Sequence, residues 1–243
     1  VRVVVTLTDQ WGACDAEGYK DVGWYRSRYR SKVATGLLST YRAWVGEVVR
    51  RYRSSPDVLA WQLVNEAETR VTRASSACVP DGARVLRDFV ADVGGEVKAI
   101  DHWHLLSVGT IGESECGVVG PEYQALHASP VVDLCEYHDY EHAALVPGDR
   151  WRGLQADLAF CRRLGKPMFV GEMGVSTKSP GLATSVGVRA SVYDNKFRAE
   201  RRVGVVGTML WAWINRAEGG SKLPFYVIGP GDPALGVVQR WSR

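Results

Sequence analysis

The sequence predicts an α/β fold in which six parallel strands alternate with helices. Short apolar runs recur along the chain, and longer segments with apolar residues three and four positions apart separate them. The clearest run covers residues 58–66, which are apolar until the polar end Asn65-Glu66. A continuous apolar run is typical of a strand that is buried on both faces of a parallel sheet. A second run begins at Pro167 and reaches Glu172.

The first half of the chain contains three of the predicted strands. Residues 2–8 form an apolar, β-branched run that ends at the turn signal Asp9-Gln-Trp-Gly12. Residues 29–52 show helical spacing, and Pro56 follows this segment. After strand 58–66, Pro80 opens a helix that we expect to reach residue 100. The apolar positions that predict helix 29–52 are Val33, Leu37, Leu38, Tyr41, Trp44, Val45 and Val48.

The second half repeats the alternation of strands and helices. Gly165 marks the end of one of its helices, because glycine is common just beyond a helix C-terminus. We expect strands at 102–110, 131–138, 167–173 and 204–213, and helices near 122–127 and at 149–164, 185–202 and 234–241.

Composition limits the classes of partner. Hydrophobic residues make up 46% and charged residues 23% of the 243 positions, which is typical of a globular protein. The net charge of +3 is too small to predict nucleic-acid binding. No apolar run reaches the roughly 18 residues of a membrane span, so we expect no membrane partner. Nine tryptophans favour a site that stacks on sugar rings. The pattern predicts neither a cofactor nor an oligomeric state.

The five cysteines follow no metal-ligand spacing. Cys135 lies in a predicted strand and Cys161 in a predicted helix, and we expect both to be buried free thiols. Cys14, Cys78 and Cys116 lie in loops that follow strands. Because loops after consecutive strands are neighbours, we expect Cys78 and Cys116 to form a disulfide, with Cys14 as the competing partner. Such a bridge suits an oxidising compartment.

Glu66 and Glu172 end two buried strands, and the carboxyl ends of parallel strands meet at one edge of a sheet. Two carboxyl groups about 5–5.5 Å apart can cleave a glycosidic bond with retention of configuration. One carboxyl protonates the leaving oxygen, and the other attacks the anomeric carbon. The two environments must therefore separate the two pKa values. We expect Glu66 and Glu172 to be this pair.

Four segments together resemble the retaining glycoside hydrolases of family 5, (β/α)8 barrels that include cellulases and β-mannanases. The segments are residues 60–66, 133–140, 166–172 and 207–211, in the order of the family's strands four, six, seven and eight. The resemblance covers nearly the whole chain and is greatest to the mannanases. It implies that Glu66 is the acid/base and Glu172 the nucleophile.

The resemblance also implies roles for residues around the pair. Asn65 would hold the 2-hydroxyl of the sugar, Tyr140 would contact the nucleophile, and His138 would help to order the site. Trp211 would form the floor beneath the scissile bond. Trp11, after the first strand, is a candidate sugar platform, with simple packing as the alternative.

Each of these residues has a purely structural alternative. Glu66 and Glu172 could be surface carboxylates, His138 a hydrogen-bonded core histidine, and Trp211 part of the barrel packing. Glu136 shares a strand face with His138 and predicts a buried polar layer, which requires a partner. His102 and His104 have ligand spacing but begin their strand, away from the glutamates, so we expect no metal there.

A complete barrel has eight strands, and the sequence shows six. The first strand corresponds to the third of the family. The two preceding strands, with an arginine that supports the nucleophile, have no counterpart. We therefore expect residues 1–243 to form a single, N-terminally truncated catalytic domain, an incomplete barrel with unpaired edges at 2–8 and 204–213. Without the arginine, the pKa of Glu172 should rise. The chain alone should fold poorly and have weak activity.

These observations predict a retaining endo-glycosidase that hydrolyses a β-1,4-linked polysaccharide, mannan or glucan, and is secreted, although the chain contains no signal peptide. The alternative is a sugar-binding barrel fragment with little or no catalysis. A metal-dependent hydrolase is disfavoured, because no histidines cluster at the strand ends.

Overall fold

The computed structural model describes residues 2–13, 18–31, 40–179, 181–214 and 226–242, and in it strands and helices alternate as predicted. Every strand pairing between named strands is parallel. The strands are β1 (Val3–Thr6), β2 (Val58–Gln62), β3 (Leu105–Ser107), β4 (Cys135–Tyr140), β5 (Met168–Gly174) and β6 (Thr208–Leu210).

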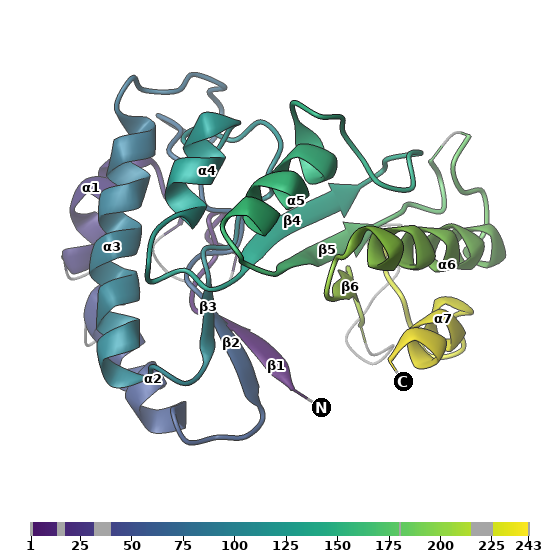
Figure 1. The fold of residues 1–243 in the computed structure, drawn as a ribbon, viewed down its shortest axis with the longest axis horizontal. Helices are drawn as coiled ribbons and strands as arrows, with labels where there is room; N and C mark the ends of the chain where they lie inside the picture. Colours follow the sequence, from purple (N-terminus) through teal and green to yellow (C-terminus); the bar gives the residue numbers. More distant parts are fainter. Residues whose placement is uncertain (1, 14–17, 32–39, 180, 215–225, 243) are drawn as a thin grey trace.

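The helices lie outside the strands (Figure 1). Helices α1 to α3 gather at one end of the molecule, α6 and α7 lie at the other end, and α4 and α5 lie between them. The helical elements are α1 (Val22–Arg26), η1 (Arg28–Arg30), α2 (Tyr41–Tyr52), α3 (Gly82–Ile100), α4 (Pro121–His127), α5 (Gly153–Arg163), α6 (Val186–Val203) and α7 (Ala234–Trp241).

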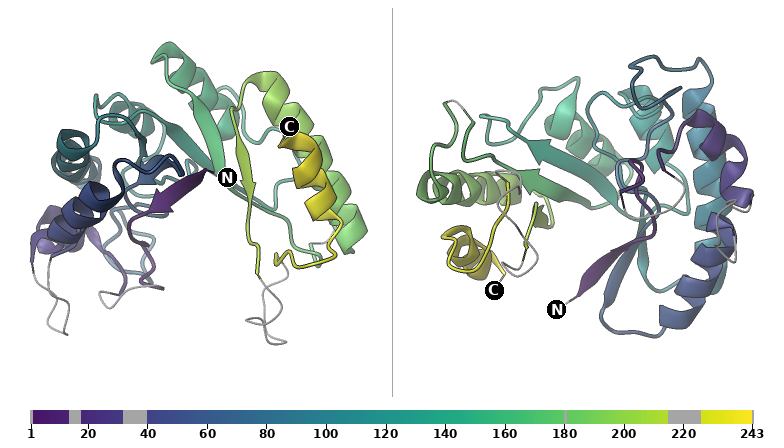
Figure 2. Two further views of the ribbon diagram at one scale, coloured as in Figure 1. Left: turned by 90° about the horizontal axis from the view of Figure 1, so that it is seen from below. Right: turned by 180° about the vertical axis from the view of Figure 1, so that it is seen from behind.

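The strands form two sheets, β1-β2-β3 and β4-β5-β6, which an isolated parallel bridge between Ser107 and Leu134 connects. Figure 2 shows the two groups of elements from below and from behind. Within the described residues, β1 and β6 each pair on one side only. This arrangement confirms an incomplete barrel with its open edges at the predicted strands.

Each sheet has its own hydrophobic core. The first core lies between β1–β3 and helices α1–α3 and contains Trp61 and Phe89. The second lies between β4–β6 and helices α5–α7 and contains Tyr137 and Tyr193. Because side chains alternate along a strand, Ala60 points away from Trp61 and joins a small third cluster with Leu134 and Phe169. This third cluster lies between the two sheets.

The helix predicted at 29–52 is shorter in the structure. Residues 28–30 form the 3-10 turn η1, Ser31 is extended, and α2 begins at Tyr41. The Thr40 hydroxyl accepts the Ala43 N–H at 3.1 Å and caps α2, a signal that the apolar spacing does not contain. Val33, Leu37 and Leu38 lie outside the described residues. Helix α1 was not predicted, since five residues are too few to show periodicity.

The predicted strands are also longer than the observed ones, except strand 167–173, which has the same length as β5. Strand 58–66 pairs only as far as Gln62, after which Asn65 makes an isolated bridge with Asp9. Strands 102–110 and 204–213 are reduced to β3 and β6. Apolar character indicates a buried segment, whereas a paired strand also needs a neighbouring strand within hydrogen-bonding distance.

No helix of the described part combines the length and apolar character of a membrane span.

Cys78 and Cys116 form the predicted disulfide, with their Cα atoms 5.2 Å apart. The prediction that Cys135 and Cys161 are free thiols was wrong, because they form a second disulfide. Their burial was predicted correctly. Helix α5 packs on β4, so Cys161 faces Cys135, a contact between neighbouring elements that burial alone does not reveal. Cys14 lies outside the described residues.

Candidate active site

Glu66 lies in the loop after β2 and has a left-handed backbone conformation, with φ of 58°. This conformation is uncommon for a residue other than glycine and persists where neighbouring contacts impose it. Asn65 N donates to Thr8 O at 2.8 Å, and Ala67 N donates to Gly109 O at 3.1 Å. A Cβ atom at Gly109 would lie 1.9 Å from Val64 O, so only glycine permits this approach. The loops after β1 and β3 therefore fix Glu66 from both sides.

Glu172 lies within β5, opposite His138 of β4 in the strand register. Every residue of β5 is buried, as the apolar run predicted. The side chain of Glu172 remains 11% exposed and that of Glu66 16% exposed, so both carboxyl groups are accessible to solvent.

The two glutamates meet at His138. His138 Nδ1 lies 3.2 Å from Glu66 Oε1 and 3.5 Å from Glu172 Oε2. One oxygen of each glutamate and one nitrogen of His138 all lie within 4.8 Å of one another. Strand ends that are far apart in sequence therefore bring the predicted pair together, at a distance compatible with the carboxyl separation of a retaining glycosidase.

Glu136 contacts the other side of the His138 ring, with Oε1 3.3 Å from Nε2. Glu136 is fully buried and accepts hydrogen bonds from Gln62 Nε2 and Ser107 Oγ, both at 2.5 Å. The buried polar layer predicted for Glu136 is thus present, and its partners come from β2 and β3. These contacts hold the His138 ring between three carboxylates.

The neighbouring carboxylates raise the pKa of His138. Burial alone would lower its pKa, but hydrogen bonds to Glu136 and Glu66 and the charge of Glu172 raise it to about 10. His138 is therefore an imidazolium at neutral pH.

The two glutamates respond to this charge differently. Burial alone would raise the pKa of Glu66. The hydrogen bond and charge interaction with His138, and the hydrogen bond from Trp11, hold this pKa below its usual value. Burial raises the pKa of Glu172, and His138 and Tyr140 only partly oppose this effect. The main causes of this shift include no arginine of the described residues, so its direction agrees with the expectation for a site without the supporting arginine.

Two aromatic residues donate hydrogen bonds to the pair. The hydroxyl of Tyr140 donates to Glu172 Oε2 at 2.5 Å, as predicted, and its ring packs edge-on against Tyr226, a neighbour that the sequence did not indicate. Trp11 Nε1 donates to Glu66 Oε2, also at 2.5 Å. Trp11 is therefore more than a packing residue, and its role as a sugar platform remains a prediction.

The remaining predicted residues lie around this centre. Asn65 Nδ2 donates to Asp9 Oδ1 at 3.1 Å. Trp211 follows β6 and is 46% exposed, which argues against simple core packing, while its contact with a sugar remains a prediction. His104 precedes β3 and bonds to Asp101 and the Ser55 carbonyl. It thus has a structural role away from the glutamates.

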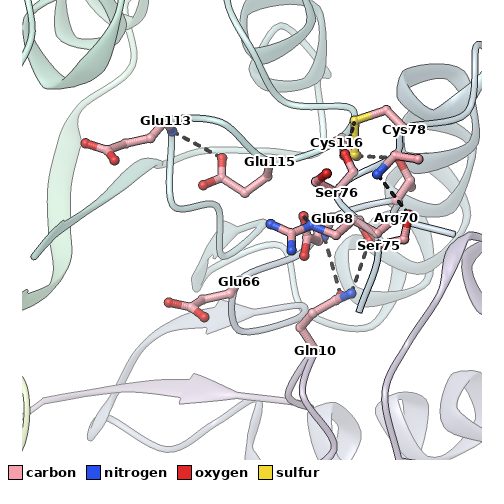
Figure 3. A network of polar contacts seen from close by, with 12 residues as sticks. Gln10, Glu66, Glu68, Arg70, Ser75, Ser76, Cys78, Glu113, Glu115 and Cys116 are labelled. Carbon is pink, nitrogen blue, oxygen red and sulfur yellow. Dashed lines mark hydrogen bonds and ion pairs between the residues drawn. A yellow bond between two sulfur atoms is a disulfide. The ribbon is translucent and has the colours of Figure 1, made fainter. Parts of the chain in front are cut away.

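Gln10 is a residue of the site region that the sequence did not single out. It is fully buried, and its Nε2 donates to Lys20 O at 2.5 Å and to Glu68 O at 3.3 Å. Glu68 in turn forms an ion pair with Arg70 at 2.7 Å. Figure 3 shows this network beside the loop that carries Glu66, with the Cys78–Cys116 disulfide at its outer end. The only sequence signal is the position of Gln10 next to Trp11.

No family model matches the chain. The chain is 26% identical over 219 residues to mannan endo-1,4-beta-mannosidase 7 of Oryza sativa subsp. japonica, an alignment that covers 77% of this chain and 52% of that protein. It is 28% identical over 225 residues to mannan endo-1,4-beta-mannosidase 1 of the same plant, covering 79% and 48%. The chain thus spans about half the length of these curated relatives.

Solved structures have the same fold. The endo-beta-1,4-mannanase of Thermotoga petrophila matches with a TM-score of 0.73 and 17% identity, over 100% of this chain and 57% of that one. The endo-1,4-beta-mannanase of Rhizomucor miehei matches with a TM-score of 0.67 and 16% identity, over 100% and 71%. An endoglucanase of Pseudomonas stutzeri matches with a TM-score of 0.61 and 13% identity, over 100% and 69%. These matches confirm the (β/α)8-type fold. Together with the curated mannosidases, they agree with the resemblance to family 5 mannanases and cellulases.

Proposed function

We propose that this chain provides the catalytic pair of a retaining endo-glycosidase that hydrolyses β-1,4-linked polysaccharide. The observation that carries the proposal is the convergence of Glu66 and Glu172, one oxygen of each lying within 4.8 Å of the other. The names of the curated relatives favour mannan over glucan as the substrate to test first.

In this mechanism Glu172 attacks the anomeric carbon while Glu66 transfers a proton to the departing glycosidic oxygen. The resulting ester links the sugar to Glu172. Glu66, now a carboxylate, takes a proton from water, and the water oxygen displaces Glu172 from the anomeric carbon. The two displacements restore both glutamates and retain the configuration of the sugar. The Tyr140 hydroxyl, on Glu172 Oε2, stabilises this carboxylate whenever it is ionised.

The pKa directions in the unliganded site are the reverse of these roles, since Glu172 is raised and Glu66 lowered. We retain the assignment because Glu66 follows Asn65 in the loop after β2, as in the family pattern. Both carboxylates contact the same imidazolium, so the three groups titrate as one unit, and a proton can be redistributed between the glutamates when substrate displaces water.

Azide rescue distinguishes the two roles. Glu66→Ala should still form the glycosyl ester from a dinitrophenyl β-mannobioside, because this leaving group needs no protonation, and azide should then give the β-glycosyl azide. Glu172→Ala should give the α-glycosyl azide, because azide occupies the position of the nucleophile. Exchanged products would reverse the assignment, and no azide product from either variant would contradict the mechanism.

One observation favours a second function, a sugar-binding barrel fragment of low activity. The described sheets are open at β1 and β6, and the main causes of the raised Glu172 pKa include no arginine of the described residues. Calorimetry with mannohexaose and cellohexaose would measure binding, and chromatography would measure hydrolysis by the same samples. Binding without product would favour this second function over catalysis.

We also propose that the protein is extracellular. The two disulfides support this location, because structural disulfides persist in oxidising compartments. Detection of the protein in the culture medium with both bridges oxidised would support the proposal, and retention of the protein inside the cells would contradict it.

A further inference from the structure

The centre of the candidate site has the geometry of a metal site. Glu66 Oε1 and Glu172 Oε2 lie 3.2 and 3.5 Å from His138 Nδ1. One ligand atom of each of the three residues lies within 4.8 Å of those of the other two. Tetrahedral Zn²⁺ with bonds of about 2.1 Å places its ligand atoms about 3.4 Å apart. The two separations from His138 Nδ1 match this value. Rotation of the glutamate side chains can bring their two oxygens to the same separation. Within the described residues, this is the one group of three such side chains.

The outer contacts of His138 also match those of a metal ligand. A histidine that binds zinc usually donates its second ring N–H to a carboxylate, which orients the ring. Here Glu136 Oε1 lies 3.3 Å from His138 Nε2, and Gln62 and Ser107 fix Glu136 in turn. Nδ1 is therefore the nitrogen that faces the two partly buried glutamates, Glu66 and Glu172.

The local charge favours a cation. Three carboxylates, Glu66, Glu136 and Glu172, surround the single imidazolium of His138, and no lysine or arginine of the described part forms an ion pair with any of them. The position borders solvent, because the side chains of Glu66 and Glu172 are 16% and 11% exposed. Imidazole and carboxylate together are ligands that suit Zn²⁺ better than Mg²⁺ or Ca²⁺.

We propose that Glu66, Glu172 and His138 Nδ1 bind one Zn²⁺ ion, which blocks the site. The ion takes the place of the proton on Nδ1, this proton leaves to solvent, and water completes the coordination. No oxidation or reduction is involved. The binding does not depend on the proposed glycosidase activity, whereas the inhibition that would follow does, so direct binding is the decisive measurement.

His142 offers a matched control, because it also lies between two carboxylates. Its Nε2 lies 2.9 Å from Glu113 Oε1, and its Nδ1 lies 2.9 Å from Asp139 Oδ1. The carboxylates contact opposite ring nitrogens, so no single position is shared by all three groups. Both His138 and His142 therefore have carboxylate neighbours. Of the two, only His138 has three possible metal-ligand atoms around one position.

The experiment is calorimetric titration of the full chain with ZnCl₂ at pH 7.5, in a Cys14→Ser background that removes the fifth cysteine as a zinc ligand. We expect one ion per chain, and at least tenfold weaker binding in Glu66→Gln and in Glu172→Gln. His142→Gln should bind zinc as the parent does, and MgCl₂ should give no binding. Circular dichroism spectra and melting temperatures of the variants without metal would show that they are folded.

A second readout is independent of the variants. Co²⁺ in a tetrahedral nitrogen and oxygen site should give visible absorption, and excess Zn²⁺ should abolish it. Unchanged zinc affinity in both folded glutamine variants, or loss of binding in His142→Gln, would overturn the proposal. Absence of zinc binding to the parent would overturn it as well. Zinc binding in a protein without hydrolytic activity would leave the site intact and contradict only the proposed function.

Discussion

Among single residues, His138 determines the charge distribution of the site. Glu66 and Glu172 lie beside Nδ1 of its ring, and Glu136 lies beside Nε2. The His138 side chain is fully buried. A protonated imidazole in this position offsets negative charge that would otherwise destabilise the folded state. Stability as well as catalysis should therefore depend on its proton.

The first prediction concerns the pH dependence of stability. The pKa of His138 is raised from 6.5 to about 10 in the folded protein, so its protonated form stabilises the fold. This contribution is fully present below pH 6.5 and is lost as the pH rises through about 10. Urea unfolding at pH 6, 8 and 10 should show a steeper decrease in the free energy of unfolding for the parent than for His138→Gln. Parallel pH profiles would contradict the assignment.

The second prediction concerns Gln10, which we infer to be a positioning residue. Gln10→Leu keeps the volume but removes the hydrogen bonds to Lys20 O and Glu68 O, and Glu68 lies two residues after Glu66. We expect kcat to fall about tenfold or more, with little change in KM, because a displaced catalytic group costs rate more than binding. The pH profile should shift as well, since Trp11 and His138 would no longer contact Glu66 in the same way.

Gln155→Leu is the matched control for Gln10. Gln155 also bridges two backbone carbonyls, those of Val146 and Gly148, but at an exposed position. Its replacement should leave kcat and the pH profile unchanged. If Gln10→Leu lowers the melting temperature but leaves both kinetic quantities unchanged, Gln10 has only a structural role.

At the level of elements, the sequence predicted every strand and all helices except α1, because buried parallel strands and amphipathic helices carry strong periodic signals. Element ends were less predictable: α2 begins at Thr40, whose capping bond is a local contact, and β2 ends before Asn65 because the ladder ends there. Glu66, Glu172, His138 and Tyr140 could be placed in or just beyond the C-terminal halves of their strands. The contacts of Trp11 and Gln10 could not, since they arise between loops.

The third prediction concerns the disulfide between β4 and α5. Cys135 and Cys161 are 26 positions apart, and a crosslink across such a loop contributes about 3 kcal/mol to the free energy of unfolding. The double variant Cys135→Ala, Cys161→Ala should therefore melt about 6–12 °C lower than the parent. Activity at 25 °C should be preserved, because this bridge lies between the strand and its covering helix. An unchanged melting temperature would show that the bridge does not stabilise the fold.

In the whole molecule, the two sheets divide the structure into halves with separate cores. The first disulfide connects two loops of the β1–β3 half, and the second lies within the β4–β6 half. Contacts between the halves include the Ser107–Leu134 bridge, the hydrogen bond from Ser107 to Glu136, and the small cluster around Phe169. Neither disulfide crosses the boundary.

The candidate active site lies across this boundary, because Glu66 belongs to the first half and His138 and Glu172 to the second. Units with separate cores can move apart before either unit unfolds. Mild heating should therefore abolish hydrolysis while the helical circular dichroism signal is still native, and cooling should restore it. Hydrolysis and the helical signal should therefore be lost at different midpoint temperatures, and a disulfide engineered across the boundary should bring these temperatures together. Equal midpoint temperatures in the parent would contradict this prediction. In such a molecule, the loss of activity reports the separation of two intact halves rather than the melting of either one.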